Sequence, residues 1–364
     1  MINYGRQSIS ASDVCAVVDA LSGSWLTQGP LVAEFEENFA SYVGAEYAIA
    51  FSSGTAALHG AAAAAGLSEK DTVYTSPLTF IASANCIRYV GAQVGLVDIA
   101  EETLNMQLVN LPSERSGIVA VHFAGLPLDL SIVDRTGTLI IEDAAHALGA
   151  ETPRGRIGNC AYSDMCCFSF HPVKAITTGE GGMVTTNSEV FADRLRKFRS
   201  HGTESRSEVA PWYYDAKTLG YNYRLTDIQA ALGISQLSQL ESFIQARNDI
   251  AVRYRSELDS DKFLLPPEAP IGYRHAYHLF VIRTKSRLRV YQELKKHGVN
   301  AQVHYIPVHH HSISSDLSFS NGLPVCDSVY EEILSLPIHP LLTAEEQTKV
   351  IRILNEMDLE EVVS

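Results

Sequence analysis

The chain has 364 residues, of which 46% are hydrophobic and 19% charged, and its formal net charge is −14. This length favours one large domain with a smaller one, and the composition is that of a folded globular protein rather than a disordered one. The negative charge argues against nucleic-acid binding, which depends on neutralising phosphates with Lys and Arg. A small anionic ligand could still be held by a few local donors.

The cysteines and the apolar runs bear on where the protein acts. The six cysteines, at 15, 86, 160, 166, 167 and 326, show no metal-type spacing, and we interpret them as reduced core residues. The N-terminus has no basic region followed by an apolar stretch, and the longest run of small apolar residues, 61–65, is far too short to span a bilayer. We therefore expect a cytoplasmic protein without membrane contacts.

Short apolar runs alternate with helix-like segments from about residue 45 onward. The predicted strands are residues 47–51, 72–76, 93–99, 117–123, 138–143, 165–170 and 181–186. Because these runs are continuously apolar, each strand is expected to be buried on both faces, as in a mostly parallel α/β sheet. Ligands of such sheets bind at the carboxyl ends of the strands.

The second half of the chain has a different pattern. Helical periodicity extends over 189–202 and 225–258, and the second of these helices is long enough to connect two domains. The remaining predicted elements are strands at 278–283 and 300–305 and helices at 289–298 and 343–357. We therefore predict a large domain over 1–245 and a small α+β domain over 246–364. Residues 1–20 are expected to pack on the small domain, and the polar segments 203–216 and 309–322 to be mobile loops.

The segment FSSGTAALHG, residues 51–60, passes from an apolar strand through Ser-Ser-Gly-Thr into an alanine-rich helix. Exposed backbone amides at a helix N-terminus favour a phosphate, with Gly54 allowing close approach and Thr55 adding a hydroxyl. The alternative interpretation is a helix capped by Ser or Thr that binds no ligand.

The segment IIEDAAHALGA, residues 140–150, places Asp143 at the end of a buried strand and His146 three residues later. A buried carboxylate costs free energy unless it meets a positive partner, which suggests that Asp143 faces a cationic ligand. The alternatives are a helix-capping Asp143 and a His146 that is hydrogen-bonded within the core.

Lys174 lies in a Gly/Thr-rich turn between two predicted strands, in SFHPVKAITTGEGG, and Ser169 stands five positions before it. An ordinary lysine is solvated at the surface. The setting of this one suggests an amine at a pocket wall, where partial burial lowers the pKa and makes the nitrogen a better nucleophile. A phosphate cradle, a strand-end Asp and a pocket Lys are the parts that pyridoxal 5′-phosphate (PLP) requires.

Five motifs in this order, SSGTAAL, PLTFIAS, EDAAHALGA, SFHPVKAITTGEGG and LGYNYRLTDIQAALG, resemble those of the DegT/DnrJ/EryC1/StrS family of sugar aminotransferases. The resemblance covers nearly the whole chain from residue 25. It implies the α/β architecture of fold-type I PLP-dependent aminotransferases, which are aspartate aminotransferase-like. That architecture has a large, mixed, mostly parallel sheet of the seven-stranded type and a small α+β C-terminal domain.

The resemblance also implies roles for individual residues. Lys174 would form the Schiff base with PLP and shuttle the proton, and Asp143 would pair with the pyridinium nitrogen. The remaining cofactor contacts would come from Gly54, Thr55 and Ser169 at the phosphate, Phe80 on the ring face and His146, where many relatives have Gln, at the ring oxygen. Asn222 would reach the cofactor phosphate of the other subunit, which implies a homodimer with shared active sites.

The segments LTQG, SFHPVKAITT, FRSHG, AQVHYIPVH and SLPIHP carry a closer likeness, to family members of the pseudaminic acid pathway. These aminate C4 of a UDP-linked 4-keto-6-deoxy-N-acetylhexosamine, and the donor implied is L-glutamate. Two alternatives stay open. One is another nucleotide keto sugar, either dTDP-linked or 3-keto. The other is a non-catalytic regulator that retained the fold, against which the intact set of Lys174, Asp143 and Ser169 argues.

The histidine-rich segment HYIPVHHH, residues 304–311, could suggest a metal. Its spacing matches no strong ligand pattern, and no acidic or cysteine residue accompanies it, so we expect no metal site. We expect instead a loop that lines the sugar-nucleotide pocket. Candidate substrate contacts are Tyr305, His309, His278 and Arg224, the last at the donor carboxylate or a phosphate.

Overall fold

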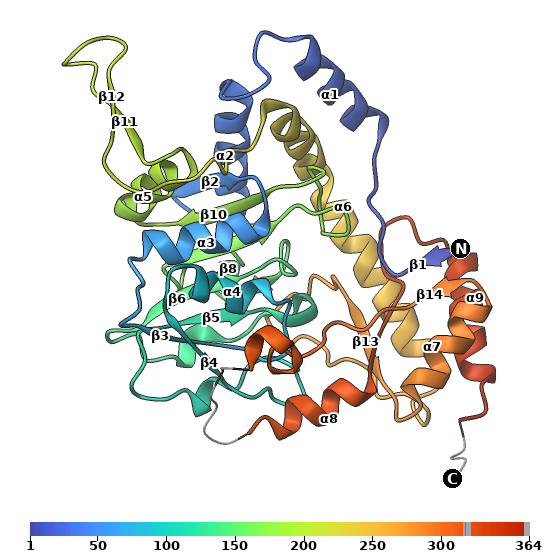
Figure 1. Ribbon diagram of the computed structural model, residues 1–364. Coiled ribbons are helices and arrows are strands. Elements are labelled where there is room, and N and C mark those ends of the chain that lie inside the picture. The colour runs from blue at the N-terminus through green and yellow to red at the C-terminus, as the bar shows by residue number, and fades with distance from the viewer. Residues whose placement is uncertain (316, 318–321, 360–364) are drawn as a thin grey trace.

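The computed structural model describes residues 1–315, 317 and 322–359 (Figure 1). Its centre is a seven-stranded sheet with the strand order β2-β10-β9-β6-β5-β3-β4. The strands are β2 (Tyr47–Phe51), β3 (Thr72–Thr75), β4 (Gln93–Leu96), β5 (Gly117–Val121), β6 (Leu139–Asp143), β9 (Met165–Ser169) and β10 (Gly182–Thr186). Neighbours from β9 to β4 are parallel, whereas β10 runs antiparallel to β9 and β2. The predicted strands and the mixed, mostly parallel α/β sheet are confirmed.

Helices cover both faces of this sheet. One face packs against α3 (Gly54–Ala64), α4 (Ala82–Tyr89) and α5 (Glu189–Arg199), and the other against α2 (Pro30–Val43) and the first half of α6 (Asp227–Glu257). Strand β9 shows why its sequence is continuously apolar. Met165 and Cys167 pack into one core, while Cys166 and Phe168 pack into the core on the opposite face.

Small residues let α3 lie close to the sheet. A Cβ atom at Gly60 would come within 2.7 Å of the Phe51 ring, so a larger side chain there would push the helix away. The helix begins at Ser53, whose Oγ accepts a hydrogen bond from the amide of Ala56 at 3.1 Å. The start of α3 is therefore fixed at the carboxyl end of β2.

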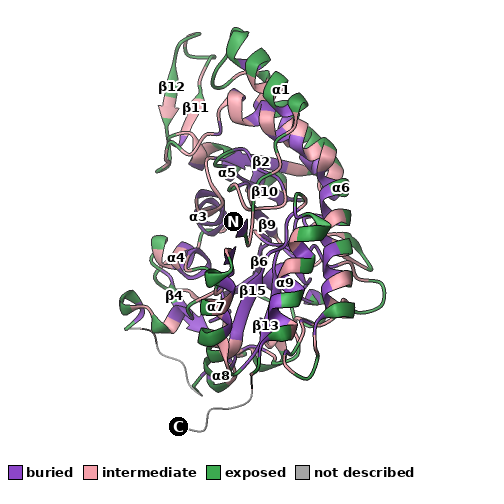
Figure 2. Cartoon of the chain, turned by 90° about the vertical axis from the view of Figure 1, so that its right-hand side faces the viewer, coloured by how far each residue is buried: buried purple, intermediate pink, exposed green. Residues whose placement is uncertain are grey.

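The C-terminal part forms a second, smaller core. Strand β13 (Phe280–Arg283) pairs antiparallel with β15 (Ile333–Leu336), and helices α7 (Arg287–Lys296) and α9 (Ala344–Glu356) pack in this core. Helix α8 (Pro324–Glu332) instead packs Cys326 and Val329 into the core beside the large sheet. Figure 2 shows β13 and β15 as buried, whereas α1 (Ala11–Ser22), α7, α8 and α9 carry exposed residues on their outer faces. The predicted strand over 300–305 is wrong beyond Val299–Asn300 (β14), because the chain turns and carries Tyr305 into a cavity.

Helix α6 belongs to both cores. Leu240 and Ile244 pack in the core beside the large sheet, whereas Ile250 and Tyr254 pack in the small one. The division at 245/246 falls inside this helix, between the two sets of contacts. We keep the domains 1–245 and 246–364 as a proposal, with residues 360–364 outside the described part of the chain.

The two parts of the N-terminal segment pack against different elements of the fold. Strand β1 (Ile2–Asn3) pairs with β14, and Ile2 is buried in the small core. Helix α1 (Ala11–Ser22) instead packs on α6, where Gln236 and Gln239 donate hydrogen bonds to the buried Asp13 carboxylate at 2.8 and 3.1 Å.

The two segments predicted to be loops both contain some regular structure. The segment 203–216 contains a hairpin of β11 (Thr203–Ser205) and β12 (Tyr214–Ala216) that extends from the body (Figure 1). The segment 309–322 includes the short turn η5 (Ser312–Ser314), and residues 316 and 318–321 lie outside the described residues. A second small hairpin joins β7 (Glu151–Thr152) to β8 (Gly155–Arg156).

The cysteines all carry free thiols, and five of them are buried as expected. The assignment of Cys15 to the core is wrong, because it lies on the exposed side of α1. Among the described residues, no helix combines the length and the apolar character that crossing a bilayer requires.

Candidate active site

A cavity of about 420 Å³ lies at the carboxyl edge of the sheet, where β6 ends at Asp143 and β9 ends at Ser169. The start of α3 and a segment of the C-terminal part complete its walls. The predicted site residues that line it are Gly54, Thr55, Phe80, Asp143, His146, Ser169, Lys174, His278 and Tyr305. Residues from four predicted motifs thus meet in one place.

The first turn of α3 touches the end of β9. A Cβ atom at Gly54 would lie 2.7 Å from the Cβ of Ser169 and 3.1 Å from its Oγ, so only glycine fits this contact. The first amides of a helix have no partner within the helix, and the helix dipole makes this end positive. The Ser169 hydroxyl, Gly54 and Thr55 therefore form a small anion-binding surface at the cavity wall.

Asp143 is held by two donors. The Ser83 hydroxyl donates to its Oδ2 at 2.6 Å, and the amide of Ala145 donates to its Oδ1 at 3.1 Å. The residue is only 7% exposed. These two hydrogen bonds hold the Asp143 carboxylate in place at the strand end, where it lines the cavity.

Lys174 brings an amine to the same cavity. Burial lowers its pKa to about 8, and the nearby Asp143 carboxylate opposes part of this shift. A lysine in water has a pKa near 10.4, so a much larger fraction of Lys174 is neutral at physiological pH. The site therefore contains a nucleophilic amine and a fixed carboxylate.

Imidazole rings also line the cavity. His146 and His278 lie with ring centroids 4.4 Å apart, and the Nε2 of His146 is hydrogen-bonded to the Tyr305 hydroxyl at 2.8 Å. Burial, together with the charge of Lys174, lowers the pKa of both histidines well below the usual value. Both rings are therefore neutral.

Phe80 and Tyr305 form an aromatic edge of the cavity. Their ring centroids are 5.8 Å apart, and the Phe80 side chain is 56% exposed where it lines the cavity. Burial raises the pKa of the Tyr305 hydroxyl, so this group stays protonated. The edge therefore offers one open aromatic face and one neutral hydroxyl.

Several residues of the site were not predicted, among them Ser83, His304 and Tyr4. Ser83 is the last residue of the PLTFIAS motif and the second residue of α4, and its hydroxyl reaches Asp143 from the start of that helix. His304 precedes Tyr305, and burial and the charge of Lys174 lower its pKa to about 3. Tyr4 gives no local signal, because only the pairing of β1 with β14 brings it to the cavity.

Three predicted residues lie outside the lining of this cavity. Asn222 is exposed and forms an isolated bridge with Ser200, and Arg224 is half-buried nearby. The Nε2 of His309 is hydrogen-bonded to the carboxylate of Asp327 at 2.7 Å. The expectation that no acidic residue accompanies the histidines is wrong, because α8 brings Asp327 back beside them.

Comparison with known proteins shows to which family the chain belongs. The profile of the DegT/DnrJ/EryC1/StrS aminotransferase family matches residues 7–355. The chain belongs to this family. Its membership confirms the expected enzyme class, the fold and PLP as the cofactor, and members act on nucleotide-linked keto sugars with an amino donor.

Two curated relatives extend over nearly the whole length of this family member. An uncharacterised protein of Methanocaldococcus jannaschii is 38% identical over 95% of this chain and 95% of its own. The UDP-4-amino-4,6-dideoxy-N-acetyl-beta-L-altrosamine transaminase of Campylobacter jejuni is 35% identical over 93% of each chain.

Solved structures agree with this assignment. Helicobacter pylori PseC, an aminotransferase of pseudaminic acid biosynthesis, superposes with a TM-score of 0.89 at 27% identity and covers 97% of this chain and 98% of its own. A Streptococcus pneumoniae protein in its PMP form gives a TM-score of 0.90 at 27% identity over 98% of each chain, and the same protein was also solved in a PLP form.

The cavity of this aminotransferase fits PLP on its own geometry. The anion-binding surface at the start of α3 suits the phosphate, and the fixed Asp143 carboxylate suits a protonated pyridine nitrogen. The neutral fraction of the Lys174 amine suits the aldehyde.

Proposed function

We propose that this chain transfers an amino group from L-glutamate to C4 of a UDP-linked 4-keto-6-deoxy-N-acetylhexosamine in pseudaminic acid biosynthesis. The observation that carries the reaction is the meeting of the Lys174 amine and the Asp143 carboxylate beside the anion-binding surface at the start of α3. The likeness to the Campylobacter jejuni transaminase over 93% of both chains supports the sugar.

The roles of the cofactor-side residues follow from their chemistry. Bound PLP supplies an aldehyde that exchanges amino groups and a ring that withdraws electrons from the bond being broken. Lys174 would hold the cofactor through its Nζ, release it to each substrate and carry the proton to and from the reacting carbon. Proton transfer by a positioned side chain typically contributes about 10²–10⁴-fold to the rate. Asp143 would keep the pyridine nitrogen protonated.

The remaining cofactor-side residues would hold the phosphate and the ring of PLP in place. Gly54, Thr55 and Ser169 would bind the phosphate, and Phe80 would cover one face of the ring. His146, whose pKa burial and the charge of Lys174 hold well below the usual value, would contact the ring oxygen as a neutral imidazole.

The substrate-side roles complete the proposal. His278 and Tyr305 would contact the sugar, because both line the same cavity as Lys174. Arg224 would bind the donor carboxylate or a phosphate, and Asn222 the cofactor phosphate of the second subunit in a homodimer. Cytoplasmic location and substrate contact by His309 remain predictions from the sequence.

A panel of keto sugars tests the reaction. The holoenzyme is incubated with L-glutamate and, separately, UDP-linked 4-keto, dTDP-linked 4-keto and 3-keto sugars, and the aminated products are identified by NMR. We expect amination at C4 of the UDP-linked sugar with the highest kcat/KM. Preferential amination of another sugar would replace the proposed substrate, and no amination of any would contradict transfer to nucleotide sugars.

A further inference from the structure

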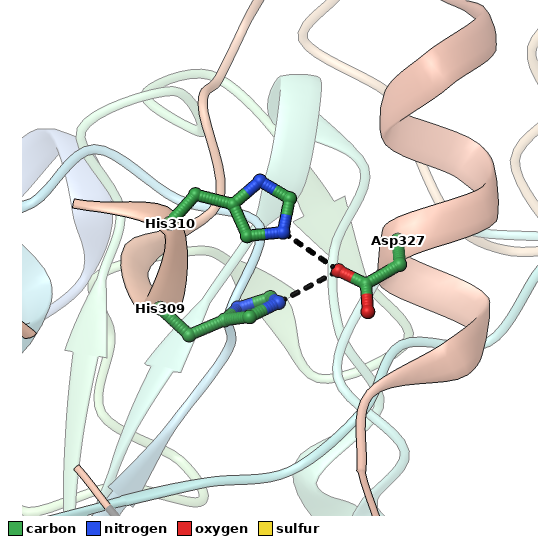
Figure 3. A group of neighbouring side chains, drawn as sticks. All are labelled: His309, His310 and Asp327. Carbon is green, nitrogen blue, oxygen red and sulfur yellow. Dashed lines mark hydrogen bonds and ion pairs between the residues drawn. The ribbon is translucent and has the colours of Figure 1, made fainter. Parts of the chain in front are cut away.

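His309, His310 and Asp327 form a cluster outside the cavity (Figure 3). The two histidines end the turn η4 (Val308–His310), and Asp327 lies in the first turn of α8. Their potential ligand atoms all lie within 4.8 Å of one another. Within residues 1–315, 317 and 322–359, this is the one group of three or more His, Cys, Asp or Glu side chains that meets such a limit.

Both imidazole rings point at the same atom. The Nε2 of His309 lies 2.7 Å and the Nε2 of His310 2.9 Å from the Oδ1 of Asp327, with the ring centroids 4.4 Å apart (Figure 3). Two donors therefore share one carboxylate oxygen. A divalent cation between the three atoms would instead satisfy each ring nitrogen and the carboxylate at once.

We propose that these three side chains bind one Zn²⁺-class divalent cation. Two imidazole nitrogens and one carboxylate oxygen are ligands that Zn²⁺ and its neighbours in the transition series prefer, whereas Mg²⁺ and Ca²⁺ favour sites made of oxygen atoms. Three protein ligands leave a fourth tetrahedral position for water. Water can reach this position, because the Asp327 side chain is 49% and the His310 side chain 35% exposed.

The required movement is small. Metal bonds of about 2.0–2.1 Å in a tetrahedral site separate neighbouring ligand atoms by about 3.3 Å, roughly 0.5 Å more than the two present nitrogen–oxygen distances of 2.7 and 2.9 Å, and all the potential ligand atoms lie within 4.8 Å of one another. The half-exposed Asp327 side chain can supply this change. The backbone on both sides is already fixed, since the amide of Val308 donates to the Pro77 carbonyl at 2.8 Å and the Asp98 carboxylate accepts from the amides of Val325 and Cys326 at 2.9 Å each.

The bound cation would join two parts of the small domain. The histidines follow directly on the segment that carries Tyr305 into the cavity, and Asp327 lies in the first turn of α8. Metal binding to the native chain alone raises its stability by mass action. Binding would therefore stabilise the connection between this segment and α8.

Metal titration of the PLP-loaded, full-length protein tests the site. The protein carries no histidine tag and is freed of metal with EDTA, and Zn²⁺ is titrated by calorimetry and Co²⁺ by its visible absorption bands. We expect one cation per chain and at least tenfold weaker binding in His310→Ala and in Asp327→Asn. His311→Ala is the matched control, because this neighbour lies outside the cluster, and it should bind as the wild type does.

Thermal unfolding separates metal binding from misfolding. Without metal, all variants should unfold near the wild-type Tm, and saturating Zn²⁺ should raise the Tm by about 2–4 °C in the wild type and His311→Ala but not in Asp327→Asn. The proposal is overturned if the wild type shows no saturable site, or if His310→Ala and Asp327→Asn both bind Zn²⁺ as the wild type does. The latter result would place the cation at the cofactor or elsewhere.

Discussion

The two walls of the cavity are built in different ways. The cofactor-side wall comes from the ends of β6 and β9, the start of α3 and the turn at Lys174, all supported by one sheet. The substrate-side wall comes from His278 and the segment 304–305, which reach the cavity from the small domain, and from Tyr4 at the N-terminus. The first wall is held by the pairing of strands within one sheet, and the second by contacts between segments far apart in the chain, among them the pairing of β1 with β14.

The walls also differ in charge. The cofactor-side wall carries the Asp143 carboxylate and the Lys174 amine, whereas the rings of His278 and His304 on the substrate-side wall both have a lowered pKa. Changes to the first wall should therefore affect the chemical step and cofactor binding. Changes to the second should affect mainly substrate affinity.

Removing the amine should have the largest effect. Lys174→Ala should bind PLP without a covalent bond and reduce kcat by at least about 10³-fold, because both the attachment and the proton transfer are lost. Borohydride trapping followed by mass spectrometry measures the attachment, and steady-state kinetics measure kcat. Lys70→Ala, at an exposed lysine, is the control. A Lys174→Ala protein with wild-type turnover would contradict the assignment.

Neutralising the carboxylate should come next. Asp143→Asn keeps the shape and an oxygen that accepts from Ser83, but it removes the charge that would hold the ring proton. We expect kcat to fall by about 10²–10³-fold, as for loss of one stabilising group in an active site. Kinetics with equal cofactor loading check this. If Asp143→Asn changed only KM, the carboxylate would act on the substrate instead.

Filling the contact between α3 and β9 should weaken cofactor binding. Gly54→Ala places a methyl group 2.7 Å from the Cβ of Ser169, which displaces the phosphate-binding turn. Overpacking of this kind typically costs about 1–3 kcal/mol, which corresponds to about 5- to 150-fold in PLP affinity if the strain falls on the site. Fluorescence titration of the cofactor-free protein measures it, and unchanged affinity would show that the helix adjusts.

The Lys174 pKa should appear in cofactor attachment. With the pKa at about 8, the neutral fraction of the amine rises about tenfold from pH 7 to pH 9 and then levels off. The rate of PLP attachment to cofactor-free protein, followed by absorbance, should show the same rise and plateau. A rate that continues to climb up to pH 10 would mean that the pKa of the lysine is not lowered.

A change on the substrate-side wall should have the smallest effect. Tyr305→Phe removes the hydroxyl that is hydrogen-bonded to His146 at 2.8 Å but keeps the ring beside Phe80. The proposed contact of this hydroxyl with the sugar would be lost as well, and one such hydrogen bond contributes about 1 kcal/mol, so KM for the sugar should rise about fivefold while kcat changes less. A large loss of kcat with unchanged KM would place Tyr305 in the chemical step and remove the distinction between the walls.

The sequence alone determined the sheet and the cofactor-side wall. Strands buried on both faces need continuous apolar runs, and parallel strands end at one edge, so Asp143 and Ser169 could be placed together from their positions after such runs. The family motifs then assigned roles along the same wall. Functional residues at strand ends and helix starts can therefore be predicted from the local sequence pattern.

Only the tertiary structure decided the rest. Tyr4 reaches the cavity through the pairing of β1 with β14, and Asp327 reaches His309 and His310 because α8 folds back over them. The predicted strand at 300–305 failed for a similar reason, since beyond Asn300 the chain pairs with β15 through a single bridge, of Gln302 with Ser335, and His304 and Tyr305 then line the cavity. Such contacts depend on the packing of segments far apart in the chain, which neither residue spacing nor local propensity records.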